Sequence, residues 1–201
     1  MNRSTSFFSG ILIPLGYVVF SLLALINYAG DFSPLNNWLS DLGSQGLNPA
    51  GWGYYNAGII LTGVLLQFFF WGLTVWKLRW NRKQNLMVTF SSIAGSLGGL
   101  SMILSAVFPI DKIEIHSFFS AALYILIGSA FVFISLAFLY LPKFPRWMSV
   151  LGFIIAIVDL LWSVFLNTYL MEFFVVGCFL LFCLLLGLQT ATRNKYMAEV
   201  R

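Results

Sequence analysis

Six long apolar stretches dominate this chain and decide what it can fold into. A helix that crosses a bilayer needs about 20 mostly apolar residues, because each residue rises about 1.5 Å against a core about 30 Å thick. Only 9% of the residues are charged, whereas soluble domains carry about 25%. We therefore predict an all-α fold, a polytopic transmembrane bundle of six helices that occupies residues 1–201 as one domain. The predicted spans are approximately Gly10–Tyr28, Trp52–Trp76, Leu86–Phe108, Ser117–Tyr140, Met148–Leu166 and Leu170–Leu188.

The basic residues predict which way the bundle faces. Ten of the eleven Lys and Arg residues precede the first stretch or follow the second, fourth or sixth, and only Lys112 falls on the other side. Loops rich in Lys and Arg stay in the cytoplasm. We therefore expect both termini and the Lys77–Lys83 loop to be cytoplasmic, in the plasma or inner membrane. The net charge of +4 reflects this topology and gives no support to nucleic-acid binding.

The longest predicted loop, roughly Ala29–Gly51, lies on the extracytoplasmic side and is rich in Gly, Pro, Asn and Ser. Such a composition favours turns and bonds from side chains to the backbone. The loop contains Asn37, Ser40 and Asp41. It is either a solvated cap over the bundle or a functional loop, and loop statistics do not separate the two.

Four short motifs at the ends of the predicted helices resemble a known family. They are Asn37-Trp38-Leu39-Ser40-Asp41-Leu42-Gly43, Tyr55-Asn56-Ala57-Gly58, Phe108-Pro109-Ile110-Asp111 with His116 five residues on, and Glu172 at the start of the last helix. They are similar to the S-D-L-G, aromatic-Asn-x-Gly, F-P-x-D…H and acidic positions of the bacterial and archaeal membrane-protein family catalogued as domain of unknown function 998. Members commonly carry arginine after the last acid, where this chain has Phe173. The resemblance covers essentially the whole chain and implies a six-helix membrane fold with no established activity.

His116, the single histidine, is the most informative candidate residue. It opens the fourth stretch close to Asp111, and Ser120 follows one helical turn later on the same face. A neutral imidazole that Asp41 or Asp111 orients is a suitable general base for Ser40 or for a water. The structural alternative is that the same contact only pins two loops together.

Asp159 is an acid inside a predicted span, about eight residues or roughly 12 Å below its outer end. A charge in hydrocarbon is costly, so we expect this side chain to face the bundle interior. It is either a functional group or a neutral acid that bonds across helices to Ser21, Ser101 or Tyr124.

A metal site is a weaker interpretation of the same residues. Zinc sites take three or more His or Cys ligands, and this chain has one histidine. His116 with Asp41, Asp111 and Glu172 forms an oxygen-rich set that suits Ca²⁺, Mg²⁺ or Mn²⁺ instead. The sequence contains no motif for an organic cofactor or for a nucleoside triphosphate.

The third stretch carries Gly95-x-x-x-Gly99 with Ala94 and Gly98 beside it. Small residues let neighbouring helices approach closely. We therefore predict that this helix lies at the buried centre of the bundle.

Together these patterns predict a polar site at the extracytoplasmic mouth that acts on or binds a lipid or other amphiphile, in the manner of a hydrolase or transferase. The predicted catalytic residues are Ser40, Asp41, Asp111 and His116, and the predicted binding residues are Asn37, Asn56, Ser120, Asp159 and Glu172. One alternative is a transport or binding protein for an ion or small molecule that uses Asp159 and the outer polar cluster. The other is a structural membrane subunit without catalysis. Membrane lipids are the expected partners in all three cases.

Overall fold

The computed structural model describes residues 3–166 and 168–197, and the fold is all-α. The long helices are α1 (Arg3–Ile26), α2 (Trp52–Gly72), α3 (Arg82–Val107), α4 (Ile113–Phe138), α5 (Arg146–Leu161) and α6 (Tyr169–Ala191), and a short α7 (Arg193–Met197) follows. Shorter helical turns are η1 (Leu39–Gly43), η2 (Leu73–Trp76), η3 (Ile110–Lys112) and the π-helical η4 (Trp162–Leu166). No strand is present in the described parts of the chain.

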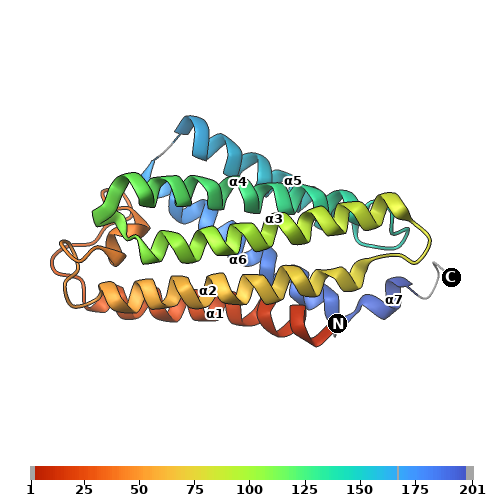
Figure 1. The fold of residues 1–201 in the computed structure, drawn as a ribbon, viewed down its shortest axis with the longest axis horizontal. Helices are drawn as coiled ribbons and strands as arrows, with labels where there is room; N and C mark the ends of the chain where they lie inside the picture. The colour runs from red at the N-terminus through yellow and green to blue at the C-terminus, as the bar shows by residue number, and fades with distance from the viewer. Residues whose placement is uncertain (1–2, 167, 198–201) are drawn as a thin grey trace.

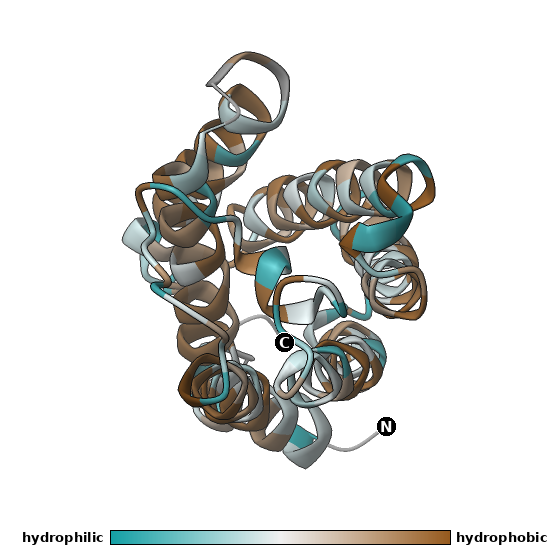
Figure 2. Ribbon diagram, turned by 90° about the vertical axis from the view of Figure 1, so that its left-hand side faces the viewer, coloured by the Kyte–Doolittle hydropathy of each residue, from teal (hydrophilic) through white to brown (hydrophobic). Residues whose placement is uncertain are grey.

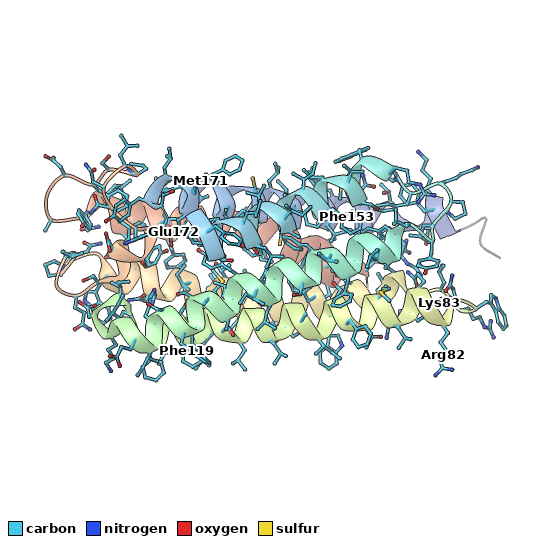
Figure 3. The ribbon with its side chains drawn as sticks, turned by 90° about the horizontal axis from the view of Figure 1, so that it is seen from above. Arg82, Lys83, Phe119, Phe153, Met171 and Glu172 are labelled. Atoms are coloured by element: carbon cyan, nitrogen blue, oxygen red, sulfur yellow. The ribbon has the colours of Figure 1, made fainter. Side chains whose placement is uncertain are left out.

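The long helices run along a common axis and form an elongated bundle (Figure 1). α1 begins and α7 ends at the same end of the bundle, where the connection between α2 and α3 also lies. The loop of residues 27–51 covers the opposite end, which we call the loop end. Glu172 lies toward the loop end, and Arg82 and Lys83 lie at the other end (Figure 3).

Within residues 3–166 and 168–197, five helices are long and apolar enough to cross a membrane: α1, α2 with η2, α3, η3 with α4, and α6. Seen along the bundle, they are predominantly apolar, and hydrophilic segments gather at their ends (Figure 2). The predicted stretch Met148–Leu166 is divided between α5, which has 16 residues, and the π-helical η4. α1 also begins earlier than predicted, at Arg3 and not at Gly10. The prediction of several apolar helices is confirmed, whereas the sixth crossing stays a prediction.

The small residues of α3 allow close packing, as predicted, but they do not bring it to the centre of the bundle. A Cβ atom on Gly99 would lie 2.9 Å from the carbonyl oxygen of Gly63 in α2. On Gly98 it would lie 2.8 Å from the side chain of Ile127 in α4. The expected central position was wrong because small residues occupy only the faces toward α2 and α4. Larger apolar residues on the remaining face are exposed: Phe90, Ile93, Leu97 and Leu100.

Aromatic side chains fill the end of the bundle opposite the loop end. Trp76 is fully buried, and its ring packs edge-on against Phe138 and Phe144 at centroid distances of 5.1 Å and 5.4 Å. Its indole N–H donates to the Thr190 hydroxyl at 3.1 Å, which satisfies the one polar atom of the side chain. The interior around Trp76 is therefore densely packed.

We expect Gly99→Ala to destabilise the protein, because the added methyl group would collide with the Gly63 backbone, which cannot rotate away. Overpacking of this kind costs about 1–3 kcal/mol. Gly177→Ala is the matched control, since nothing lies within 4 Å of the corresponding position in α6. The midpoint of thermal unfolding in detergent should fall for Gly99→Ala and stay level or rise slightly for Gly177→Ala. Equal midpoints would contradict the close contact between α2 and α3.

Candidate functional site

The loop at the loop end is an ordered cap. Asn48 is fully buried within it, and its amide nitrogen donates to the carbonyls of Ala24 at 3.1 Å and Leu42 at 2.9 Å. Its amide oxygen accepts the N–H of Gly51 at 3.0 Å. One side chain thus joins the end of α1, the η1 turn and the start of α2. The loop has a fixed shape and can position residues over the bundle.

Asp41 and Asn37 stabilise the η1 turn itself. A carboxylate oxygen of Asp41 accepts the backbone N–H of Trp38 at 3.0 Å and the Asn37 amide at 3.4 Å, as the third residue of a helix does in a capping box. The Asn37 oxygen accepts the N–H of Ser33 at 3.0 Å. Burial raises the pKa of the Asp41 carboxyl above its ordinary value, against the opposing effect of these two hydrogen bonds. Both residues therefore serve the local loop fold.

Gly43 closes the same turn against α2. The Asn56 amide donates to the Gly43 carbonyl at 2.9 Å. A Cβ atom on Gly43 would lie 2.6 Å from the Asn56 side-chain oxygen, so only glycine permits this approach. The S-D-L-G motif, through Gly43, and the aromatic-Asn-x-Gly motif, through Asn56, therefore contact each other.

Asp111 ties the loop to the connection between α3 and α4. Its carboxylate accepts the Ser44 hydroxyl at 2.9 Å and the backbone N–H groups of Gln45 at 2.9 Å and Gly46 at 3.2 Å. With three donors already bound, this carboxylate is a structural tie between two loops.

His116 caps the end of α3. Its Nδ1 lies 2.9 Å from the carbonyl oxygen of Ser105 and 3.0 Å from that of Phe108. The Ser105 carbonyl has no helical partner because the residue four positions on is Pro109, which lacks an N–H. Carbonyl oxygens only accept hydrogen bonds, so Nδ1 carries the proton and Nε2 is left as an acceptor.

The expected direct hydrogen bond from His116 to an acid is replaced by these bonds to two carbonyls. Among residues 3–166 and 168–197, no hydrogen bond joins His116 to Asp41 or Asp111. The carboxylate of Asp111, although nearer in the chain than Ser105 or Phe108, already accepts three donors from the loop, whereas the carbonyls at the end of α3 need a donor. Backbone carbonyls take the orienting role that the sequence had suggested for an acid.

A cavity lies beneath the cap, between helices α1 to α6. Its polar lining consists of Tyr17, Ser40, Tyr55, Asn56, Ser105, His116, Ser120, Tyr124, Asp159 and Glu172. Its apolar lining includes Ile59, Met102, Leu123, Ile127, Phe131, Ile155, Val175, Val176 and Phe179. The space open to the centres of water molecules is about 70 Å³, which is room for roughly five waters. A cavity of this size admits a slender molecule.

Glu172 connects two parts of the cavity wall. Its carboxylate accepts the backbone N–H of Leu39 in η1 at 2.7 Å, and Tyr124 of α4 lines the same cavity. Nearby, the hydroxyls of Tyr17 and Tyr55 lie 3.3 Å apart. The sequence interpretation missed Tyr17 and Tyr55 as site residues. A signal for Tyr17 was present, since a tyrosine in the middle of a predicted span lies too deep for the interfacial belt.

Asp159 faces the bundle interior, where only 4% of its surface is exposed. Its Oδ1 has no hydrogen-bond partner in the described parts of the chain, so neither Ser21, Ser101 nor Tyr124 supplies one. A Cβ atom on Gly128 would lie 2.7 Å from Oδ2, so the carboxyl rests against the backbone of α4. Buried polar atoms without partners are rare and call for an explanation.

The residues predicted from sequence thus fall into two groups. Those that line the cavity are Ser40, Asn56, His116, Ser120, Asp159 and Glu172. Those that stabilise the cap without lining the cavity are Asn37, Asp41 and Asp111. Within residues 3–166 and 168–197, no three His, Cys, Asp or Glu side chains gather closely enough to hold a metal ion.

Comparison with known proteins gives one result. No curated protein and no solved structure matches the chain. The model of the family described as protein of unknown function DUF998 matches residues 11–192, which is most of the sequence. The chain therefore belongs to the DUF998 family, as the motifs at its helix ends predicted.

Proposed function

We propose that this protein binds an amphiphilic molecule, such as a lipid, in the cavity beneath its cap. In this proposal the chain crosses the plasma membrane six times, with both termini in the cytoplasm and the cap outside. The polar part of the ligand contacts polar side chains of the cavity lining, and its apolar part lies along the helices.

The observation that carries the proposal is the length and lining of the cavity. Along α4 the lining runs from His116 to Phe131, a distance of 15 residues or about 22 Å. Its first two positions on that helix are His116 and Ser120, and its last two are Ile127 and Phe131. Ligand sites are typically apolar pockets with a few convergent polar groups. An elongated cavity with apolar walls and a few polar groups among them fits an amphiphile.

Support for six crossings comes from the continuity of α5 and η4. Together they cover Arg146–Leu166 without a break, which is long enough for about 20 residues of membrane-spanning helix. Support for the orientation comes from the ten-to-one division of the cations and from the bundle, in which Arg82 and Lys83 lie opposite the cap.

The orientation predicts how two single cysteines react with a membrane-impermeant maleimide, once Cys178 and Cys183 are replaced by alanine. Both test positions, Gln45 and Lys83, are exposed. Gln45→Cys should react in intact cells, and Lys83→Cys should react only after permeabilisation. Reaction of Lys83→Cys in intact cells would overturn the orientation.

If the cavity binds the amphiphile, two neighbouring substitutions in α4 should differ in their effect on ligand occupancy. Ser120→Trp places an indole ring into the cavity, whereas Ala121 is exposed on the outer face of the helix. Native mass spectrometry should detect a co-purified amphiphile on the wild type and on Ala121→Trp. Its occupancy on Ser120→Trp should fall about tenfold, the effect of about 1.4 kcal/mol of lost binding energy. Unchanged occupancy in Ser120→Trp would rule out the cavity as the binding site.

A second candidate function, hydrolysis or group transfer on the bound amphiphile, rests on the state of His116. Because Nδ1 donates to two carbonyls, Nε2 is free to accept a proton. Ser40 and Ser120 line the same cavity and provide hydroxyl groups, and water is a third candidate nucleophile. In this version His116 is the general base, without an acid to orient it.

This version predicts that His116→Gln abolishes turnover and spares the fold. The glutamine amide still donates to the carbonyls of α3 but accepts no proton at neutral pH, so the rate should fall by about 10²–10⁴. Mass spectrometry of lipids incubated with proteoliposomes measures the turnover. Glu114→Gln, an exposed change in the same helical turn, is the control and should behave like the wild type. Equal turnover in both variants would exclude His116 as a base.

A further inference from the structure

The cavity carries two acidic side chains and no lysine or arginine that could pair with them in the described residues. The two acids are Asp159 and Glu172. His116 is the one basic side chain in the lining, and its Nδ1 is already committed to two carbonyls. Buried charges in proteins are normally paired. The unbalanced acids therefore point to a positive group that the protein itself does not supply.

The two acids differ in how far their own surroundings satisfy them. Glu172 accepts the backbone N–H of Leu39 at 2.7 Å, so its carboxylate has a partner. Asp159 is 4% exposed, and its Oδ1 has no partner in the described chain. Since it lines the cavity, this carboxyl is free to meet a donor from a ligand.

The walls around Asp159 suit an organic cation more than a hydrated metal ion. The side chains of Tyr124, Phe131 and Phe179 line the same cavity, and aromatic faces attract ammonium groups. Ile127 and Ile155 add apolar surface, which offers no replacement for the water shell of an inorganic ion. Gly128, the residue against the Asp159 carboxyl, has no side chain to fill the space beside it.

We propose that the amphiphile is a lipophilic amine whose ammonium group binds the Asp159 carboxylate. Glu172 adds a second negative charge to the same cavity, and the apolar part of the amine lies against the isoleucine and phenylalanine walls. This inference rests on the proposed amphiphile site and names the class of its ligand. A straight-chain amine matches the narrow, elongated shape of the cavity.

Three probes with the same alkyl chain test the charge preference: decylammonium, decanol and decyl sulfate. Their binding is measured by equilibrium dialysis against the full-length protein in nanodiscs of uncharged phosphatidylcholine, with empty nanodiscs subtracted. Decylammonium is charged at neutral pH, because an alkyl amine titrates near the lysine value of about 10.4. We expect its Kd to be at least about tenfold lower than that of decanol, and decyl sulfate to bind weakest, since a desolvated charge pair is worth at least one factor of ten.

Substitutions test whether the preference for decylammonium over decanol depends on Asp159. Asp159→Asn should remove the advantage of decylammonium over decanol, and Asp31→Asn, the same change at an exposed acid outside the cavity, should keep it. If Asp159→Asn does not fold, the preference of the wild type and its persistence in Asp159→Glu decide the question.

The possible outcomes distinguish a failure of the amine proposal from a failure of the proposed amphiphile site. Equal binding of decylammonium and decanol, or a preference that survives in Asp159→Asn, overturns the amine proposal while the amphiphile site stands. If none of the three probes binds above the empty nanodiscs, both proposals fail.

Discussion

Hydrocarbon offers no hydrogen bonds, so each polar group of a membrane-embedded chain needs a partner inside the protein or at its ends. Many hydroxyl side chains obey that constraint through bonds within their own helix, and several polar side chains bond to the backbone of a neighbouring helix. Ser6 donates to the Phe69 carbonyl at 3.1 Å, Gln67 to the Ser96 carbonyl at 2.7 Å, and Ser91 to the Ala130 carbonyl at 2.9 Å. Asp159 departs from this pattern, and it does so in the wall of a cavity. The departure is the reason to regard that cavity as a binding site.

The same constraint explains why the F-P-x-D…H motif occurs where α3 ends. Pro109 stops the helix and leaves the Ser105 carbonyl without its usual donor. His116 supplies that donor through Nδ1, and Asp111 binds the loop that covers the helix end. One short motif thus terminates a helix, holds the cap and fixes the orientation of the imidazole. Its structural and functional roles are parts of one arrangement.

The two ends of the bundle are packed differently and therefore differ in the space that they leave for a ligand. The end with Trp76 is filled by aromatic side chains, and the one polar atom of that indole is bonded. The loop end holds the cavity and the ordered cap. α5 changes to a π-helix at Trp162, a turn after Asp159, and such distortions occur frequently at functional sites. The features that bear on function are therefore concentrated in the half of the molecule beneath the cap.

The sequence by itself determined the all-α class, the apolar helices and the family, because hydropathy and short motifs are local properties of the chain. It also brought out Ser40, Asn56, His116, Ser120, Asp159 and Glu172, since polar residues at or within apolar spans stand out. Only the tertiary structure decided which polar residues meet. Helix rotation and crossing set those contacts, and neither is encoded in a local pattern. For this reason Asp41 and Asp111 turned out to hold the cap, and carbonyls orient His116. The hydroxyls of Tyr17 and Tyr55 meet in the cavity wall, a contact that no local pattern indicated.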